Sequence, residues 1–195
     1  NGGATITDYA IQYSTDNTTW TTFSDGTSAS LSASVTGLSS NTLYYFKVAA
    51  VNAQGTGSYS SSTSKATLPN APTALSGTTV SNTSISLSWT APSGTVTSDY
   101  EIKYSSDNIT FNTVTDGVST STSVTLTGLS ANQMYYFKVA AINSAGTGAF
   151  SSVAQKQTAP GAPTGLSATV LTSSTVSLSW TAPTGGNQAI TDYKI

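Results

Sequence analysis

The 195-residue sequence contains no cysteine, no histidine and no arginine. Without cysteine it has no disulfides, no thiolate metal sites and no cysteine nucleophile, and without histidine it has no Ser-His-Asp or Cys-His catalytic group. Its basic residues are six scattered lysines, which cannot form the basic stripe that neutralises nucleic-acid phosphates. These absences exclude most catalytic chemistry and predict no nucleic-acid partner.

Charge is also scarce, because only 7% of the residues are charged and the net charge is -2. No apolar run approaches the roughly 20 residues of a membrane-spanning helix, so this segment is not expected to insert into a membrane. Ten tyrosines, five phenylalanines and three tryptophans supply packed cores, which argues against disorder. In place of charge, 34 serines and 36 threonines keep the surface hydrated, and threonine favours strands.

The sequence repeats itself with a period of 91 residues. Leu-Ser-Trp-Thr-Ala-Pro begins at Leu87 and again at Leu178 (178 − 87 = 91). Tyr-Tyr-Phe-Lys-Val-Ala-Ala begins at Tyr44 and again at Tyr135 (135 − 44 = 91). A period of this length predicts one small domain per repeat instead of a solenoid of short units.

Apolar and polar residues alternate within each repeat. Ile85, Leu87 and Trp89 alternate with serine and threonine, and residues 100–104 and 135–141 follow the same rule. A period of two predicts strands that have one buried and one hydrated face. Turn signals separate these strands and no helical period is present, so the pattern indicates an all-β sandwich.

The acidic residues are the remaining candidates for catalysis or metal binding. Glycoside hydrolysis needs two carboxyls roughly 5 to 9.5 Å apart in a cleft, and Ca²⁺ needs roughly six to eight oxygens. The carboxylates here are single, without an Asp-x-Asp cluster, and most recur one period apart: Asp8 with Asp99, Asp16 with Asp107, and Asp25 with Asp116. Recurrence at turns is typical of turn capping. We therefore expect no catalytic, cofactor-binding or metal-binding residue, and no enzyme.

The central repeat resembles a fibronectin type III domain, of bacterial or phage type. The residues that carry the resemblance are an opening proline, a tryptophan on the second strand, a Tyr-x-Ile-x-Tyr third strand and a Gly-Leu pair before a corner tyrosine. They are Pro72, Trp89, Tyr100 to Tyr104, Gly128-Leu129 and Tyr135. In this family the hydroxyl of the corner tyrosine bonds to upstream backbone. The resemblance implies tandem immunoglobulin-like β-sandwiches, one complete and two partial.

The resemblance also implies which side chains form the core. The expected structural core is Trp89, Trp180, Tyr44, Tyr135, Leu38, Leu129, Ile102 and Tyr104. By alternation, Tyr45 and Tyr136 should face outward, and they form a candidate contact surface.

The expected domains are residues 1–68 (partial, strands C to G), 71–158 (complete) and 162–195 (partial, strands A to C). Short linkers with prolines such as Pro69 and Pro160 join them. A partial sandwich exposes its core, which leaves three explanations open. The chain is a window within a longer array, or neighbouring molecules complete each other head to tail, or a boundary was set in error.

The expected function is that of a non-catalytic structural spacer or adhesion repeat in a long extracellular surface protein or filament. One alternative is a phage virion domain, in a tail or capsid decoration, that binds host-surface glycans. Another is an accessory repeat of a secreted polysaccharide hydrolase. No cofactor is expected. The expected partners are neighbouring repeats, with surface glycans or other protein subunits as further candidates, and the expected location is extracellular (cell surface, secreted or virion).

Overall fold

A computed structural model of the chain describes residues 3–195 and contains strands but no helix in that range. The all-β fold predicted from the sequence is confirmed. The chain divides into two compact units. Unit 1 comprises Asn1–Ala71, Pro92–Tyr100 and Ala141–Ala149, and unit 2 comprises Pro72–Ala91, Glu101–Ala140 and Phe150–Ile195.

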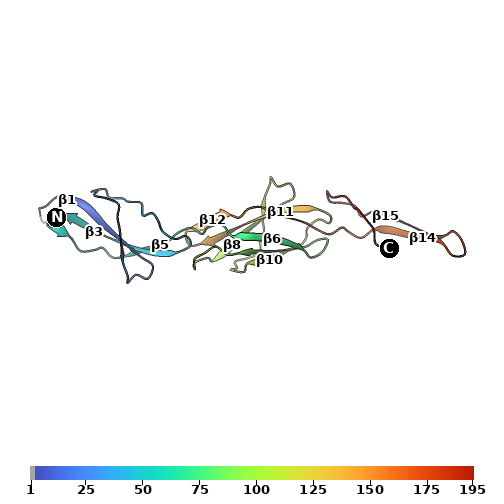
Figure 1. Cartoon of the computed structure of the whole chain (residues 1–195), viewed down its shortest axis with the longest axis horizontal. Helices are drawn as coiled ribbons and strands as arrows, with labels where there is room; N and C mark the ends of the chain where they lie inside the picture. Colours follow the sequence, from blue (N-terminus) through green and yellow to red (C-terminus); the bar gives the residue numbers. More distant parts are fainter. Residues whose placement is uncertain (1–2) are drawn as a thin grey trace. The chain divides into compact units, whose positions relative to one another are not determined.

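The strands fall into three stretches of sequence, which we name the N-terminal segment (1–68), the central repeat (71–158) and the C-terminal segment (162–195) (Figure 1). The N-terminal segment holds β1 (Ile6–Ser14), β2 (Thr21–Phe23), β3 (Leu43–Asn52), β4 (Gly55–Thr56) and β5 (Thr63–Ala66). The central repeat holds β6 (Thr73–Thr79), β7 (Ile85–Thr90), β8 (Asp99–Ser105), β9 (Asn112–Thr113), β10 (Ser123–Leu126), β11 (Met134–Asn143), β12 (Gly146–Phe150) and β13 (Ala154–Gln157). The C-terminal segment holds β14 (Thr164–Val170) and β15 (Val176–Thr181).

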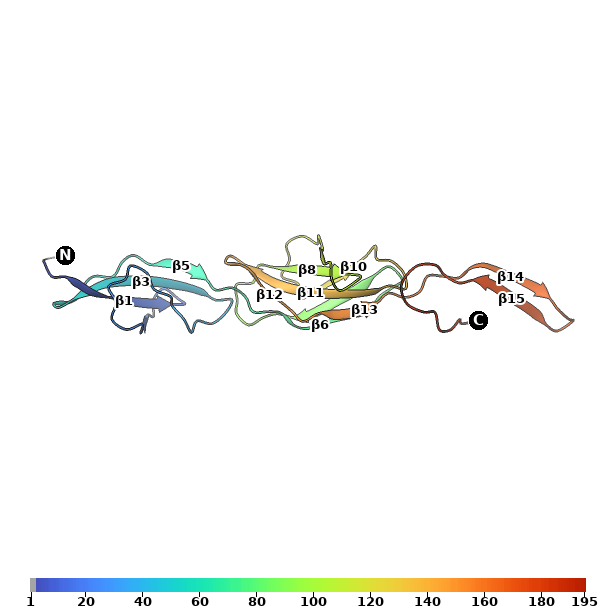
Figure 2. The same cartoon turned by 90° about the horizontal axis from the view of Figure 1, so that it is seen from above.

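The central repeat is built from two sheets. One has the strand order β10-β7-β6, and the other has the order β12-β11-β8-β9 with β13 paired to β11. Figure 2 labels β6 and β10 of the first sheet and β8, β11, β12 and β13 of the second. Ile85 and Leu87 on β7, together with Phe137 and Val139 on β11, are 0% exposed. Since side chains of a strand point alternately to its two faces, the period of two in the sequence buries one face of each strand.

The N-terminal segment forms one sheet of the same kind. Its strand order is β2-β1-β3-β4, with β5 paired to β3, and within residues 3–71 the structure forms no second sheet. Residues 32–35, which correspond to β10 one period later, form no strand. In the central repeat β10 pairs with β7, and this segment has no counterpart of β7 among its described residues.

The C-terminal segment contains a single hairpin, in which β14 pairs with β15. Its register matches that of β6 and β7 one period earlier: Ala168 lies opposite Leu178 as Gly77 lies opposite Leu87. The hairpin leaves apolar side chains exposed, including Leu166 (71%) and Val170 (74%). Residues 191–195, where a third strand was expected, form none.

Five of the eight expected core residues are buried, and three are only partly buried. Trp89, Tyr44, Tyr135, Leu129 and Ile102 are buried. Leu38, Tyr104 and Trp180 are only partly buried. Leu38 lies in the segment with a single sheet, and Trp180 lies in the segment with a single hairpin. No second sheet packs on these side chains.

Candidate functional site

Of the aspartates that recur one period apart, Asp16 and Asp107 bind the backbone of their own turns, whereas Asp8 accepts a hydrogen bond from the N–H of Ser28, 20 residues away. The Asp16 carboxylate accepts hydrogen bonds from the N–H groups of Thr18 (2.8 Å) and Thr19 (2.7 Å) and from the Ser14 hydroxyl (2.8 Å). The backbone bond from Thr19, followed by those from Thr18 and Ser14, lowers the pKa of Asp16. A carboxylate that is satisfied in this way shapes a turn and is not poised for acid–base chemistry.

Asp107 repeats this arrangement one period later. Its carboxylate accepts bonds from the Ser105 hydroxyl (2.7 Å) and from the N–H groups of Ile109 and Thr110 (2.8 Å each). The bond from Ser105 is the largest cause of the lowered pKa of Asp107. The residue after each aspartate, Asn17 or Asn108, has a φ of 60°, a conformation that asparagine tolerates.

No group of three or more histidine, cysteine, aspartate or glutamate side chains gathers anywhere in residues 3–195 in a way that could hold a metal ion. Glu101 instead pairs with Lys103, with 3.1 Å between the carboxylate oxygen and Nζ. Over the same residues, no helix is long and apolar enough to cross a membrane.

Tyr45 and Tyr136, the expected contact residues, are both partly buried. On β3, Tyr45 lies two residues from Lys47, so both side chains share the outer face of the sheet. The Nζ atom of Lys47 lies 4.0 Å from the ring centroid of Trp20 and 4.8 Å from that of Tyr59. This outer face therefore carries a lysine held between two aromatic rings.

The central repeat has the same cluster at the corresponding positions. Lys138 lies two residues from Tyr136, and its Nζ atom is 4.1 Å from the ring centroid of Phe111 and 4.9 Å from that of Phe150. Neither cluster was predicted from the sequence. The 91-residue period could have revealed them, because it relates Trp20 to Phe111 and Tyr59 to Phe150.

A buried asparagine marks the place where the N-terminal segment meets two loops of the central repeat, all within unit 1. Asn41 is 0% exposed and has a φ of 49°. Its Nδ2 donates to Thr97 Oγ1 (2.8 Å), and its Oδ1 accepts from Asn143 Nδ2 (3.1 Å). Its carbonyl accepts from the N–H of Thr95 (3.2 Å). One side chain and its backbone thus bind both loops at once.

The backbones approach closely at this junction. A Cβ atom at Gly94 would collide with the carbonyl oxygen of Asn41, and one at Gly148 would collide with that of Pro69. Asn143 also donates to the carbonyl of Thr67 (2.8 Å). Only glycine fits such close contacts without moving the backbone.

The second junction lies within unit 2 and uses the asparagine 91 residues later. Asn132 is 5% exposed and has a φ of 54°. Its Nδ2 donates to the carbonyl of Gln188 (2.5 Å), and its carbonyl accepts from the N–H of Asn187 (3.1 Å). A Cβ atom at Gly186 would collide with the Asn132 backbone. A buried asparagine therefore binds a loop of the following repeat at both junctions, although that loop is longer at the second junction.

Asn41 and Asn132 were not among the residues predicted from the sequence to be functional. The sequence does contain a signal, because an asparagine recurs three residues before each corner tyrosine: Asn41 before Tyr44, and Asn132 before Tyr135. An asparagine at this position is also typical of an ordinary turn. Its hydrogen-bonding partners lie in loops of the next repeat, so the local sequence does not reveal them. The corner itself forms as the resemblance implied: the N–H of Ser130 donates to the Tyr135 hydroxyl (2.9 Å).

Residues 1–66 and 70–157 match the family described as the fibronectin type III domain. Modules of this family are non-catalytic. The human receptor-type tyrosine-protein phosphatase H is 35% identical over 153 residues, which is 77% of this chain and 13% of that protein. The mouse protein sidekick-1 is 29% identical over 213 residues, which is 94% of this chain and 9% of that protein. This chain thus spans only a small part of these relatives.

The crystal structure of the chicken CNTN1 FN1-FN3 domains is also similar, with 24% identity and a TM-score of 0.44. The similarity covers 77% of this chain and 56% of that one.

Proposed function

The chain belongs to the fibronectin type III family, and from that premise we propose that it is a non-catalytic spacer segment of a long extracellular surface protein. The match lies in the N-terminal segment and the central repeat. We further propose that residues 1–68, 71–158 and 162–195 are successive repeats, the first and last incomplete. The repeated sequence and the shared register of the hairpins β6–β7 and β14–β15 support this division.

The observation that carries the proposal is the asparagine junction. A spacer must resist bending between its repeats, and a linker of a few residues with proline limits bending only in part. Asn41 and Asn132 add hydrogen bonds from a buried side chain to the loops of the following repeat. If one side chain of such a hydrogen bond is removed, the remaining donor or acceptor stays buried without a partner. This lowers the free energy of unfolding by about 1–3 kcal/mol.

The outer faces supply the adhesive part of the proposal. Each repeated sheet presents a tyrosine beside a lysine that lies between aromatic rings. Tyrosine and other aromatic side chains are enriched in protein interfaces, where they offer a large contact area with little loss of conformational entropy. We propose Tyr45 and Tyr136 as contact residues for other protein subunits.

The junction is tested by measuring how much neighbouring repeats move. The chain has no native cysteine, so Ser62→Cys and Thr120→Cys place spin labels at two exposed sites. Electron double resonance should give a narrow distribution of distances between the labels. Asn41→Gly removes the side-chain hydrogen bonds but tolerates the positive φ, so it should broaden the distribution without unfolding the chain.

Asn82→Gly is the matched control, because Asn82 is exposed and lies in the turn between β6 and β7. It should leave the distribution unchanged. A distribution that is already broad in the unmodified chain, or one that Asn41→Gly does not broaden, would contradict a spacer function that depends on this junction.

The more specific origins stay predictions. A bacterial or phage type, a virion domain and an accessory repeat of a polysaccharide hydrolase are distinguished by the modules that flank this segment in the parent protein, such as a catalytic domain, an anchor motif or a tail protein. Specific binding of the chain on a glycan array would favour a binding module over a spacer.

A further inference from the structure

Strand β10 of the central repeat lies at the edge of its sheet. The strand order β10-β7-β6 leaves one side of β10 without a neighbouring strand among the described residues. On the other side, the N–H of Trp89 on β7 donates to the carbonyl of Thr122 (3.0 Å). Because the backbone groups of successive residues in a strand point to opposite sides, those of Ser123 and Thr125 are directed to the free side. A free edge of this kind is a template for pairing with another chain.

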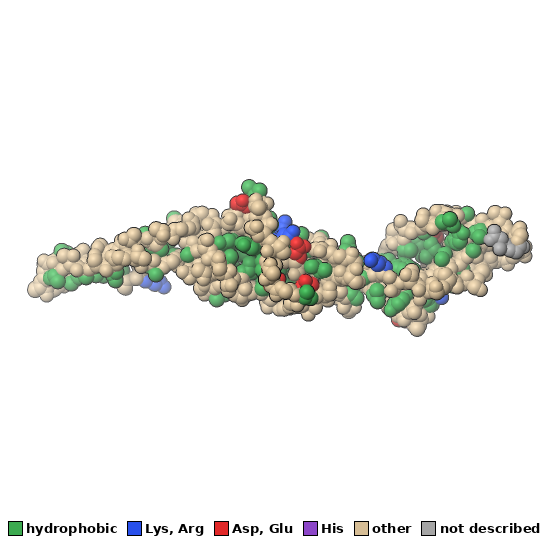
Figure 3. Space-filling model, turned by 180° about the vertical axis from the view of Figure 1, so that it is seen from behind, with side chains coloured by type: hydrophobic (Ala, Val, Ile, Leu, Met, Phe, Trp, Pro, Cys, Tyr) green, Lys and Arg blue, Asp and Glu red, His purple; other side chains and the backbone are tan. Residues whose placement is uncertain are grey.

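The sequence of this edge lacks the residues that usually protect one. Natural edge strands carry charged side chains or proline, which hinder pairing with other chains. No charged residue and no proline occurs in residues 117–137. Charged side chains are also few on the face of the molecule shown in Figure 3. Residues 121–127 are rich in β-branched side chains and carry no charge, a composition that favours pairing between strands of different chains.

A serine hydroxyl instead binds the backbone groups at the start of this edge. Ser121 Oγ donates to the carbonyl of Ser123 (3.0 Å) and accepts from the N–H of the same residue (3.3 Å). The N–H of Ser121 donates in turn to Ser119 Oγ (3.1 Å). Serine side chains that bind nearby backbone groups in this way compete with strand pairing. A partner strand would have to displace these bonds before it could pair at Ser123.

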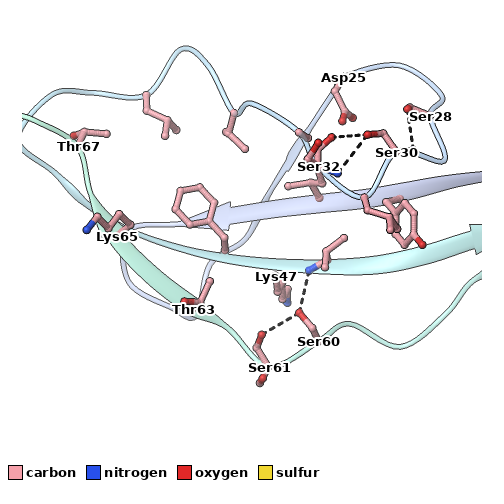
Figure 4. A pocket seen from close by; sticks show the side chains of 18 of the residues that line it. Asp25, Ser28, Ser30, Ser32, Lys47, Ser60, Ser61, Thr63, Lys65 and Thr67 are labelled. Carbon is pink, nitrogen blue, oxygen red and sulfur yellow. Dashed lines mark hydrogen bonds between the residues drawn. The ribbon is translucent and has the colours of Figure 1, made fainter. Parts of the chain in front are cut away.

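The same bonds form one period earlier in the N-terminal segment. Ser30 Oγ donates to the carbonyl of Ser32 (3.1 Å) and accepts from its N–H (3.4 Å), and the N–H of Ser30 donates to Ser28 Oγ (3.2 Å). Figure 4 labels these three serines and marks the hydrogen bonds between them. Residues 32–35 form no strand, so the bonds arise from the local sequence and do not need a neighbouring strand.

We propose that the hydroxyl groups of Ser119 and Ser121 keep the β10 edge from pairing with the β10 edge of a second copy of this chain. They act where other edge strands use charge or proline. Neighbouring repeats of similar sequence are prone to pair wrongly with one another, so an array of such repeats benefits from protection at each free edge. The proposed spacer function is not needed for this protection.

Ser121→Val should open the edge to pairing. Valine has no hydroxyl, so the N–H and the carbonyl of Ser123 would lose their partners. Two such edges would then pair antiparallel across a two-fold axis, because the same strand is presented by both copies. Residue 121 is exposed, so the substitution should leave the repeat folded.

Disulfide cross-linking detects this pairing, because the chain has no native cysteine. Thr125→Cys places one thiol on the exposed side of β10, and paired edges bring two such thiols close together. Dimer is measured on a non-reducing gel after mild oxidation, over a series of chain concentrations. Thr125→Cys alone should give little dimer. Addition of Ser121→Val should raise the yield roughly tenfold, the effect expected of two further hydrogen bonds of ordinary strength.

Matched variants separate the loss of the hydroxyl from other effects of the substitution. Thr120→Val adds the same side chain at the exposed neighbouring position, which takes no part in the serine bonds. Ser121→Thr keeps a hydroxyl at position 121. Both should leave the yield from Thr125→Cys unchanged. Ile109→Cys places the thiol outside β10, at a residue that is 83% exposed, and its low yield should be the same with and without Ser121→Val.

Equal yields from Thr125→Cys with and without Ser121→Val overturn the proposal. An equal rise with Thr120→Val overturns it too, because apolar character would then be the cause. A high yield from Thr125→Cys alone would show that the edge is unprotected, and a rise that Ile109→Cys shares would place the contact elsewhere. Each of these two results also overturns the proposal.

Discussion

At the scale of single residues, the aspartates at positions 16 and 107 show how a charge is used in a chain that has few. Each accepts two backbone N–H bonds and one serine hydroxyl bond in the turn after a long strand. Hydrogen bonds to the ionised form favour that form, so the pKa of each carboxyl falls. The charge stabilises the turn in which it lies.

This predicts a pH dependence of stability that Asp107→Asn should weaken. The folded-state pKa of Asp107 lies below its ordinary value of 3.8. Its contribution to the free energy of unfolding is therefore fully present above that value and is lost as the pH falls through the folded-state pKa. Urea unfolding from neutral pH to below 3.8 should show the largest difference between the two chains at neutral pH.

Asp116→Asn is the control for that series, since Asp116 is an exposed aspartate in the same repeat. Its variant should keep the pH dependence of the unmodified chain. An Asp107→Asn chain with the same pH dependence as the unmodified one would show that the turn bonds contribute nothing measurable.

At the scale of structural elements, the loops decide how repeats join. The strands of each repeat pair among themselves, and the loops around Thr97 and Asn143 reach Asn41. Glycine at positions 94 and 148 lets the backbones approach. The junction thus uses glycines that allow close backbone contact and buried asparagine amides.

Gly94→Ala should destabilise the chain more than Gly117→Ala. Gly94 has a φ of 99° and Gly117 a φ of 81°, so alanine strains the backbone at both, by about 1–2 kcal/mol. At Gly94 the new Cβ atom would also collide with the Asn41 carbonyl, whereas nothing lies within 4 Å at Gly117. Urea unfolding measures both, and equal losses of stability would contradict a close junction contact.

At the scale of the whole molecule, the same strand sequence occurs in two environments. Tyr-Tyr-Phe-Lys-Val-Ala-Ala forms part of β3 and of β11. Phe137 is 0% exposed on β11, whereas Phe46 on β3 is only partly buried. The intrinsic strand preference is equal, so any difference in local stability comes from the second sheet.

Hydrogen exchange should reveal that difference. Amides of β3 are expected to exchange faster than the same amides of β11, because local opening costs less where fewer apolar contacts are broken. The measurement compares matched amide positions of the two strands in the unmodified chain. Equal exchange rates in the two strands would mean that the second sheet adds little to the local stability of β11.

The sequence by itself determined the all-β class, the period of 91 residues and the strands of the central repeat, because alternation and turn residues act locally. The strand expected within residues 191–195 does not form. The sequence also placed the corner tyrosines, since the family spacing around Tyr44 and Tyr135 is local. Burial could not be read in this way. Val48 and Val139 stand in the same sequence, and only the presence of a second sheet distinguishes them.

The tertiary structure alone decided the junctions and the burial of each sheet. In the sequence, Asn41 is typical of a turn residue. In the structure it is buried, because its hydrogen-bonding partners Thr97 and Asn143 lie in loops 56 and 102 residues further along the chain. The burial of the central sheet β12-β11-β8-β9 likewise depends on the second sheet of that repeat. Hydrophobic burial and buried hydrogen bonds depend on neighbours far along the chain, and a local pattern does not specify them.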